Sequence, residues 1–393
     1  MNARQIFQRH LAQTSPAPLG LHVTHAEGCT LRDAEGKEYL DLIGGISVAN
    51  VGHRHPRVVE AIKAQADRYL HTMVYGELVQ SPQVEYAQTL TALLPPHLDC
   101  IYFTNSGAEA TEGALKLARR LTGRPHIVAA HNSYHGATLG ALSLIGDEMW
   151  RAPFRPLIPG VLHRHYNGDD FLEAITEQTA CVILETVQAE AGVIAPDLIW
   201  LRAIRERCTA TGALLVFDEI QCGFGRTGTL WGFQQYSVEP DILLLGKALG
   251  GGMPLGAFVS SHEKMQAFTH SPVLGHITTF GGHPVCCAAG LAGLQAMVEE
   301  KMMEGVETKS NLFSLLLNHP KIIAVRAAGL LIAVELKSAE MVGKALARCL
   351  EEGLFSDWFL FAPHCIRIAP PLVISETEIR RACNILLNAL DDA

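Results

Sequence analysis

The stretch ALLVFDE, residues 213–219, decides the fold class of this chain. Five apolar residues run without interruption into two carboxylates, and such continuous runs are typical of strands that are covered on both faces. Further runs of this kind occur at Cys100–Phe103, Ile127–Ala130, Cys181–Leu184, Ile242–Leu245 and Ala257–Ser260. Helical patterns lie between them, including Glu109–Leu121 and Leu198–Thr211. This alternation predicts an α/β fold whose large domain is built on a mostly parallel central sheet.

The C-terminal part of the chain follows a different pattern. Strand-like segments lie at Ile322–Arg326, Leu330–Leu336 and Cys365–Ala369, and helical ones at Ala339–Glu352 and from Ser375 onward. Paired strands with helices to one side predict a smaller α+β domain, and the N-terminal segment is expected to pack with it. We therefore expect a large domain over residues 46–290, and a small domain formed by residues 1–45 together with residues 291–393.

Composition narrows the classes of function. The 393 residues carry 31 lysines and arginines against 40 aspartates and glutamates, which gives a formal net charge of −9. This acidic balance argues against binding to nucleic-acid phosphates. The sequence shows no apolar stretch long enough for a membrane span, no secretory signal and, among its ten cysteines, no C-x-x-C motif. We expect a cytoplasmic protein with no nucleic-acid partner, no membrane partner and no metal site.

A possible anion site lies where a helix follows the first apolar run. Ser106 precedes Glu109 by three residues, which is the spacing of a capping box. The start of such a helix offers unpaired N–H groups and the positive end of its dipole, and Gly107 allows an anion to approach the backbone closely. Taken alone, the motif is better explained by a well-capped helix that binds nothing.

Two charged residues stand at the ends of apolar runs. Asp218 lies at the strand end where ligands bind in open α/β sheets, although a structural aspartate that caps the next turn is the alternative. Lys247 is the only charge within residues 242–252, and triple glycine follows at residues 250–252. Desolvation lowers the pKa of a lysine and frees the neutral amine to attack carbonyl groups. A lysine that reaches to the surface is the alternative reading.

Together these features meet the needs of one cofactor, pyridoxal phosphate, which has an anionic tail, a ring nitrogen and an aldehyde. Ser106, Gly107 and Ala108 would hold the phosphate. Asp218 would keep the ring nitrogen protonated through a charge-assisted hydrogen bond. Lys247 would supply the amine that bonds to the aldehyde.

A competing nucleotide motif occurs at Gly223–Gly228, which matches G-x-G-x-x-G and is followed by Asp241. In a dinucleotide site the glycines join a strand directly to the start of a helix. Here residues 218–222 intervene, and residues 229–233 show no helical start. We therefore do not expect a nicotinamide cofactor.

A series of ordered motifs runs through most of the chain. They are GHRHP (52–56), NSGAEA (105–110), YHG (134–136), ETVQAE (185–190), DEIQCGFGRTG (218–228), GKALGGG (246–252), TFGGHP (279–284) and RIAPPL (367–372). In these motifs the chain resembles the class III aminotransferases of fold type I, which depend on pyridoxal phosphate, and it is close to their acetylornithine and ornithine branch. The resemblance extends from about Gly20 to the C-terminus and is specific for the family, though not for its substrate.

The resemblance implies roles for further residues of the cofactor site. Tyr134 would stack on the pyridine ring, with His135 beside it in the cofactor pocket. Gln221 would lie near the phenolic oxygen of the cofactor. Thr279 would reach the phosphate bound to the other subunit, so that a homodimer forms the complete site. Lys247, once released by the incoming amine, would move the proton between the substrate and the cofactor.

The resemblance also implies a substrate site. Arg367 would bind the substrate α-carboxylate through a two-pronged contact. Glu190 would act as a gate, pairing with Arg367 while an ω-amine is bound and releasing it for a keto acid.

Some positions depart from the family pattern. Ala137 stands where the branch that uses 2-oxoglutarate has an arginine for the distal carboxylate, and the loss of such a contact is worth roughly 1.5–3 kcal/mol. This argues against glutamate and 2-oxoglutarate as the second substrate unless another cation, such as Arg151 or Arg164, takes the place of the missing arginine. Thr186, Ala189 and His283 also replace the family's proline, glycine and asparagine, with no functional consequence that the sequence indicates.

The sequence thus predicts a homodimeric transaminase with a ping-pong cycle. Its donors would be acetylornithine, ornithine, 4-aminobutyrate or a related ω-amine or amino acid, and its acceptor a 2-keto acid. An isomerase, racemase or decarboxylase on the same scaffold would need no second carboxylate pocket and so remains compatible with Ala137. A non-catalytic protein that only binds the cofactor is the other alternative.

Overall fold

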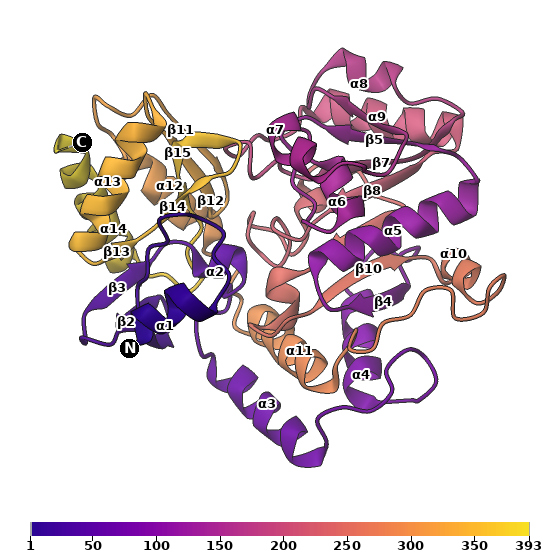
Figure 1. Ribbon diagram of the computed structural model, residues 1–393, viewed down its shortest axis with the longest axis horizontal. Helices are drawn as coiled ribbons and strands as arrows, with labels where there is room; N and C mark the ends of the chain where they lie inside the picture. The colour runs from indigo at the N-terminus through magenta and orange to yellow at the C-terminus, as the bar shows by residue number, and fades with distance from the viewer. Residues whose placement is uncertain (1, 393) are drawn as a thin grey trace.

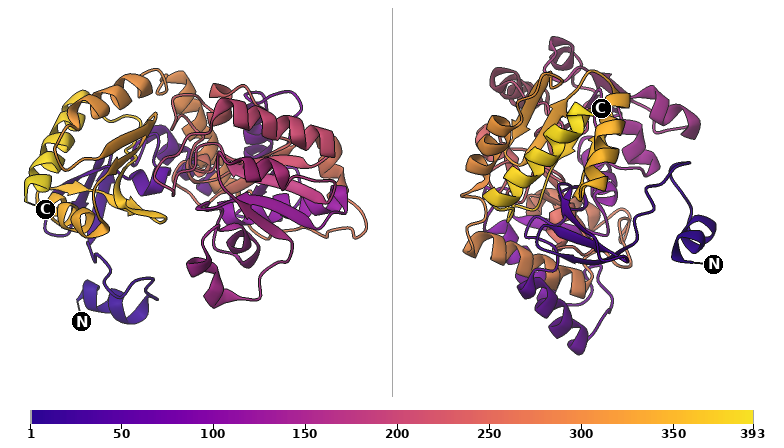
Figure 2. Two further views of the ribbon diagram at one scale, coloured as in Figure 1. Left: turned by 90° about the horizontal axis from the view of Figure 1, so that it is seen from above. Right: turned by 90° about the vertical axis from the view of Figure 1, so that its left-hand side faces the viewer.

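The computed structural model describes residues 2–392. Segments from both ends of the chain, coloured indigo and yellow, lie together on one side of the molecule, and the middle of the chain fills the other side (Figure 1). The left view of Figure 2, from above, shows the same division. Among residues 2–392, no helix has the length and the apolar character needed to cross a membrane.

The large sheet has seven strands in the order β4-β10-β9-β8-β7-β5-β6. They are β4 (Cys100–Thr104), β5 (His126–Ala130), β6 (Val161–Arg164), β7 (Thr179–Glu185), β8 (Leu214–Asp218), β9 (Ile242–Leu245) and β10 (Gly256–Ser260). Strand β10 runs antiparallel to both neighbours, and the other neighbouring pairs are parallel. The prediction of an α/β fold with a mostly parallel sheet is confirmed. The prediction missed β6, because its sequence VLHR is short and half polar.

The helices account for most of the remaining regular structure. They are α1 (Ala3–His10), α2 (Gly44–Ser47), α3 (Pro56–Arg68), α4 (Ser81–Thr91), α5 (Gly107–Thr122), α6 (Leu139–Leu144), α7 (Glu148–Arg151), α8 (Asp169–Glu173), α9 (Leu198–Thr211), α10 (His262–Met265), α11 (Pro284–Glu299), α12 (Val306–Leu316), α13 (Ala339–Glu351) and α14 (Glu376–Asp391). Short 3-10 turns lie at η1 (Ala152–Phe154), η2 (Gly232–Gln235), η3 (Lys247–Gly250) and η4 (Gln266–Phe268).

Packing on both faces explains why the strands read as continuous apolar runs. Along β7, Cys181 and Ile183 belong to a core cluster that contains residues of α5. The alternate residues Val182 and Leu184 belong to a second cluster that contains residues of α9. Since neighbouring side chains of a strand point to opposite faces, helices on both sides require apolar residues at every position.

Two smaller sheets contain the ends of the chain. One, in the order β1-β2-β3-β13, comprises β1 (Val23–Glu27), β2 (Thr30–Asp33), β3 (Glu38–Asp41) and β13 (Leu354–Phe355). The other, in the order β11-β12-β15-β14, comprises β11 (Ala324–Ala328), β12 (Leu331–Glu335), β15 (Ala362–Ile368) and β14 (Asp357–Phe359). Strands β3 and β13 pair in parallel, so the N-terminal segment joins the C-terminal part through backbone hydrogen bonds.

The domain boundaries at residues 45/46 and 290/291 stay a prediction. Residue 290 falls within α11, a continuous helix that packs against α3 and α4. For function, the important feature is the shared direction of β5, β7, β8 and β9. Because these strands are parallel, their carboxyl ends lie at one edge of the sheet, which is where ligands bind in such sheets.

Candidate active site

A cavity of about 320 Å³ opens at this edge of the large sheet. It is lined by Gly107, Ala108, Tyr134, His135, Gly136, Ala137, Glu185, Asp218, Ile220, Gln221, Cys222 and Lys247. Seven of the predicted site residues therefore line one cavity, although they come from four separate motifs. A larger cavity of about 410 Å³ lies between α1 and β1, but apart from Arg4 and His22 its lining is apolar or glycine.

Lys247 follows β9 after one residue, Gly246, and begins η3. Its backbone φ is +49°, a left-handed conformation that costs energy for a residue with a side chain and that clusters at functional sites. Its Nζ donates a hydrogen bond of 2.9 Å to Oε1 of Gln221. Burial lowers the pKa of Lys247, while the carboxylates of Glu190 and Asp218 act in the opposite direction. The amine is therefore easier to deprotonate than an ordinary lysine.

Asp218 ends β8, and both its carboxylate oxygens are engaged. Its Oδ2 lies 2.7 Å from Nδ1 of His135, and its Oδ1 accepts a hydrogen bond of 3.0 Å from the backbone N–H of Ile220. The side chains of Asp218 and His135 are almost fully buried. Nε2 of His135 and Nε2 of Gln221 are buried and have no hydrogen-bond partner among residues 2–392. Both residues line the cavity, and a buried polar atom without a partner calls for an explanation such as a ligand.

The start of α5 forms another wall of the cavity. The Ser106 hydroxyl accepts from the backbone N–H of Glu109 at 3.2 Å, as predicted. The Glu109 carboxylate, however, binds the N–H of Asn105 instead of Ser106, so the capping box is incomplete. A Cβ on Gly107 would lie 2.8 Å from Cδ1 of Ile220, so glycine fits here without displacement of its neighbour. Ser106 itself is exposed and does not line the cavity, whereas Gly107 and Ala108 do.

Glu185, the first residue of the ETVQAE motif, is a further site residue, for which the sequence predicted no role. It ends β7, where all residues are buried, and it accepts hydrogen bonds from the backbone N–H of Tyr134 at 3.0 Å and of Ala189 at 2.8 Å. Burial raises the pKa of Glu185 to about 7, although the His135 ring acts in the opposite direction. Its position at the end of a continuous apolar run is the same signal that identified Asp218. Burial, together with Glu190, also raises the pKa of Tyr134.

The predicted pair of Arg367 and Glu190 is present. Nη1 and Nη2 of Arg367 donate to the two carboxylate oxygens of Glu190 at 2.8 and 2.9 Å. Both side chains are buried, with exposures of 2% and 6%. A further carboxylate that the sequence analysis missed, Asp357, lies 3.0 Å from Nε of Arg367. Nothing in its local sequence marks it, because it is one polar residue in a mixed segment.

Thr279 lies apart from these residues. It is exposed, in the loop between η4 and α11, and it does not line the cavity. Its predicted contact involves a second subunit and therefore stays a prediction.

No arginine is among the residues that line the cavity, and the Ala137 side chain is exposed beside it. Arg151 pairs with Glu148 at 2.7 Å, and Arg164 donates to the backbone oxygen of His163 at 2.8 Å. Neither of these two candidate cations lines the cavity.

The other departures from the family pattern have local structural partners. Oγ1 of Thr186 donates to the buried carboxylate of Glu219 at 2.5 Å. The backbone N–H of Ala189 binds Glu185, as described above. Nδ1 of His283 accepts from the N–H of Val285 at 3.3 Å and so caps α11.

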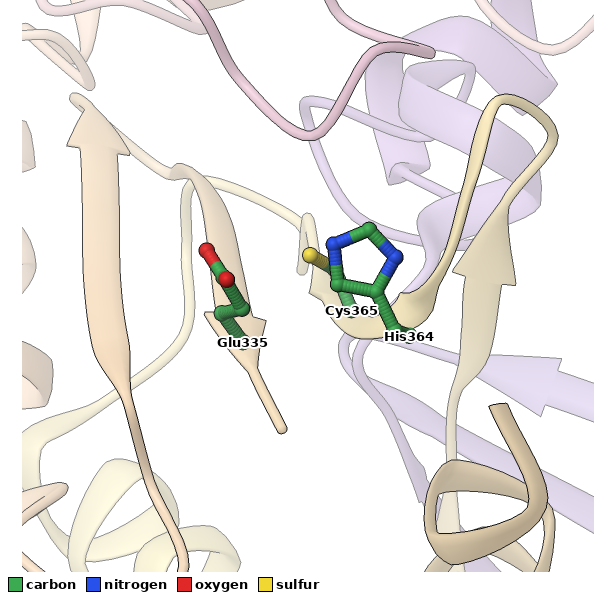
Figure 3. Close-up of side chains that lie close together, drawn as sticks. All are labelled: Glu335, His364 and Cys365. Carbon is green, nitrogen blue, oxygen red and sulfur yellow. The ribbon is translucent and has the colours of Figure 1, made fainter. Parts of the chain in front are cut away.

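A group of possible metal ligands lies elsewhere, on adjacent strands of the small β11-β12-β15-β14 sheet. Glu335 comes from β12, and His364 and Cys365 come from β15 (Figure 3). The guanidinium of Arg326 already binds Glu335 and donates to Sγ of Cys365 at 3.2 Å. Because this cation already occupies the carboxylate and the sulfur, we assign no metal to the group.

Comparison with known proteins agrees with this arrangement. The family model "Aminotransferase class-III" matches residues 11–390. The acetylornithine aminotransferase of Methanosarcina mazei is 41% identical over 376 residues, which cover 94% of this chain and 91% of that protein. The acetylornithine aminotransferase of Streptomyces coelicolor is 40% identical over 378 residues, covering 95% and 92%.

Solved structures give the same result. The ornithine aminotransferase of Toxoplasma gondii, reported with partial occupancy of pyridoxal phosphate at its active site, matches with a TM-score of 0.91 and 29% identity over 99% of this chain and 93% of that chain. An (S)-enantioselective ω-transaminase of Thermomicrobium roseum matches with a TM-score of 0.90 and 30% identity over 99% and 97%. The chain therefore belongs to the class-III aminotransferases.

Proposed function

We propose that this aminotransferase takes the amino group from the ω-amine of an amino acid of the acetylornithine, ornithine or 4-aminobutyrate kind and gives it to a 2-keto acid. The observation that carries the proposal is the buried Arg367–Glu190 pair, whose charges influence the pKa of Lys247. The relatives named acetylornithine aminotransferase support the choice of donor. The donor and the acceptor are small molecules in this proposal.

The cavity fits pyridoxal phosphate, which the family implies as cofactor. Its walls offer an amine with a lowered pKa, a buried carboxylate and two residues whose buried side-chain nitrogens have no partner, around a volume of about 320 Å³. The start of α5, at Ser106, Gly107 and Ala108, would hold the phosphate. When bound, pyridoxal phosphate supplies an aldehyde that carries the amino group and a ring that stores the electron pair of the breaking C–H bond.

Three other residues would hold the ring of the cofactor. Tyr134 would lie against its face, Asp218 would pair with its nitrogen, and Gln221 would lie near its phenolic oxygen. His135 supports this arrangement because it holds Asp218 at 2.7 Å in a buried setting. Because His135 fixes the orientation of the Asp218 carboxylate, its charge would stay directed at the ring nitrogen.

Lys247 would act both as the residue that holds the cofactor and as the general base and acid. Its Nζ must accept a proton from the substrate carbon and later return one. A lowered pKa favours the neutral amine that can accept this proton.

Arg367 and Glu190 would separate the two halves of the ping-pong cycle. While Glu190 occupies both prongs of the guanidinium, Arg367 cannot bind a substrate carboxylate in the same way. An ω-amine needs no such contact next to its reacting carbon, whereas the keto acid carries a carboxylate there. Release of Glu190 would therefore accompany binding of the keto acid.

We also propose a homodimer, in which Thr279 reaches the phosphate site of the other subunit. Its exposed position in the η4–α11 loop is compatible with this role. The cysteines of the structure are free, and most are buried, which suits a reducing compartment such as the cytoplasm.

The test is a panel of amine donors against pyruvate and 2-oxoglutarate with the purified, cofactor-supplied enzyme. We expect turnover with ω-amines and an acceptor requirement in every case, and a visible absorbance band that the donor alone bleaches. Turnover of an amino acid without any keto acid would instead indicate an isomerase or a decarboxylase. A protein that shows neither turnover nor the band would refute the proposal.

A further inference from the structure

Arg367 has a second carboxylate neighbour that the proposed function does not use. Asp357 lies on β14 directly opposite Arg367 on β15, in the register of the antiparallel pair. Side chains of directly opposed residues lie side by side on the same face of a sheet. Oδ1 of Asp357 is 3.0 Å from Nε of Arg367, and the Asp357 side chain is 28% exposed.

The contacts of the Arg367 guanidinium divide between its two edges. The edge formed by Nη1 and Nη2 holds Glu190, and Nη2 also donates to the backbone oxygen of Trp358 at 2.9 Å. The Nε edge faces Asp357. The face of the guanidinium lies over the ring of Phe359, 4.6 Å from its centroid. In the proposed cycle, only the Nη1–Nη2 edge changes its partner, from the Glu190 carboxylate to the carboxylate of the keto acid.

The contact to Asp357 is electrostatic. Nε of Arg367 and Oδ1 of Asp357 are close, but their geometry does not make an aligned hydrogen bond. Burial raises the pKa of Asp357 to about 6, while Arg367 acts in the opposite direction. The neighbouring Arg367 favours the ionised form of Asp357, which places a negative charge behind the guanidinium.

We propose that Asp357 is a positioning residue that holds the Nε edge of Arg367, so that its other edge stays directed at the site while Glu190 is exchanged for the keto-acid carboxylate. This inference rests on the proposed function of Arg367 and Glu190. A buried arginine that loses its only carboxylate is left unpaired, which is costly. With Asp357 in place, Arg367 keeps one ion pair in both halves of the cycle.

The test compares Asp357→Asn with the wild-type holoenzyme in each half of the reaction. Asparagine keeps the shape of the side chain and removes its charge. We expect the KM for the keto acid to rise about tenfold, the order for one weakened charge-assisted contact, with kcat changed less. In the donor half-reaction, an ω-amine bleaches the visible absorbance band. The rate of this bleaching and its dependence on donor concentration should change little, because Glu190 holds Arg367 during this half-reaction.

A second measurement does not depend on turnover. Propionate has a carboxylate but can neither give nor take an amino group. Its dissociation constant, measured by calorimetry on the holoenzyme, should rise by a similar factor in Asp357→Asn. Asp357→Glu, which restores the charge, should recover most of the affinity, and Glu340→Gln, which removes an exposed carboxylate 78% accessible, should behave as wild type.

Two outcomes would overturn the proposal. One is an unchanged KM for the keto acid together with unchanged propionate affinity. The other is an equal loss in both half-reactions with a lowered melting temperature, which would show that Asp357 only stabilises the fold. If the wild-type enzyme transfers no amino group at all, the proposed function fails, and the propionate measurement then still tests the contact between Asp357 and Arg367.

Discussion

Glu190 and Arg367 are 177 residues apart in the chain, and they meet through two hydrogen bonds of 2.8 and 2.9 Å. Glu190 follows the carboxyl end of β7, and Arg367 lies on β15 in a separate sheet. The backbone reinforces this meeting, because the N–H of Leu360 donates to the Glu190 carboxylate at 2.9 Å. Because Glu190 occupies both Nη atoms of the buried Arg367, a substrate carboxylate can bind these atoms only after Glu190 has left them.

Replacement of Glu190 by glutamine should change donor selectivity. The neutral amide holds Arg367 less tightly, so that α-amino acids, which bring a carboxylate next to the reacting amine, gain access to Arg367. We compare kcat/KM for ω-amine donors with kcat/KM for α-amino acid donors. The ratio of the first to the second should fall about tenfold or more, which corresponds to the contribution of one charge-assisted contact. Steady-state kinetics with an ω-amine and with alanine measure the ratio.

The matched control is Glu376→Gln, in an exposed ion pair with Arg380. It should leave the ratio as in wild type. If the ratio is also unchanged in Glu190→Gln, Glu190 does not act as a gate.

Replacement of Lys247 by alanine removes both the attachment of the cofactor and the proton transfer. Proton transfer by a placed side chain alone is worth roughly 10²–10⁴-fold, so we expect kcat to fall by at least this factor. The visible band of the cofactor-supplied protein should move to that of the free aldehyde. Lys63→Ala removes an exposed lysine, 64% accessible, and should change neither quantity. Full transfer activity in Lys247→Ala would exclude the role given to Lys247.

The elements that the sequence predicted well are those with a strong local signal. The runs in β7 and β8 are apolar because both of their faces are covered, and the carboxylates that end them mark the edge with the cavity. Asp357 had no such signal. Its importance comes from the antiparallel register that sets it opposite Arg367, and this register follows from the folding of the whole small sheet.

Hydrogen bonds at the start of α5 show another limit of sequence reasoning. The spacing of Ser106 and Glu109 correctly predicted that the Ser106 hydroxyl caps the helix. The Glu109 carboxylate, however, accepts a hydrogen bond from the N–H of Asn105, one residue before the N–H that a capping box would use. The choice between adjacent N–H groups depends on backbone angles that residue types alone do not determine. The role of Thr279 depends on contacts with a second chain and therefore stays a prediction.

Ala137 predicts a substrate preference that one substitution can change. It is exposed beside the cavity, and no arginine lines the cavity. We expect Ala137→Arg to lower the KM for 2-oxoglutarate relative to that for pyruvate about tenfold or more, because it adds a charge-assisted contact to the distal carboxylate. Ala137→Met, which adds length without charge, is the control and should not shift the ratio. A wild-type enzyme that already prefers 2-oxoglutarate strongly would contradict this use of Ala137.

Glu219 should make the stability of the protein depend on pH. It is fully buried and accepts hydrogen bonds from Thr186 Oγ1 at 2.5 Å and from the N–H groups of Gly232 and Phe233 at 2.8 Å each. Burial nevertheless raises the pKa of Glu219 from 4.5 to about 7. Between these two pH values the native state binds a proton that the unfolded state has released, so the free energy of unfolding falls as the pH rises and stays low above pH 7.

The variant Glu219→Gln carries no titrating group at this place. Its stability relative to wild type should therefore improve from pH 5 to pH 8, by up to about 3 kcal/mol if the shift of the pKa is fully expressed. Any hydrogen bond that glutamine makes less well adds a constant to both measurements and cancels in the difference. Urea unfolding of both proteins at the two pH values measures it, with Glu340→Gln as the exposed control. A difference that stays the same at both pH values would mean that Glu219 is ionised in the native protein throughout this range.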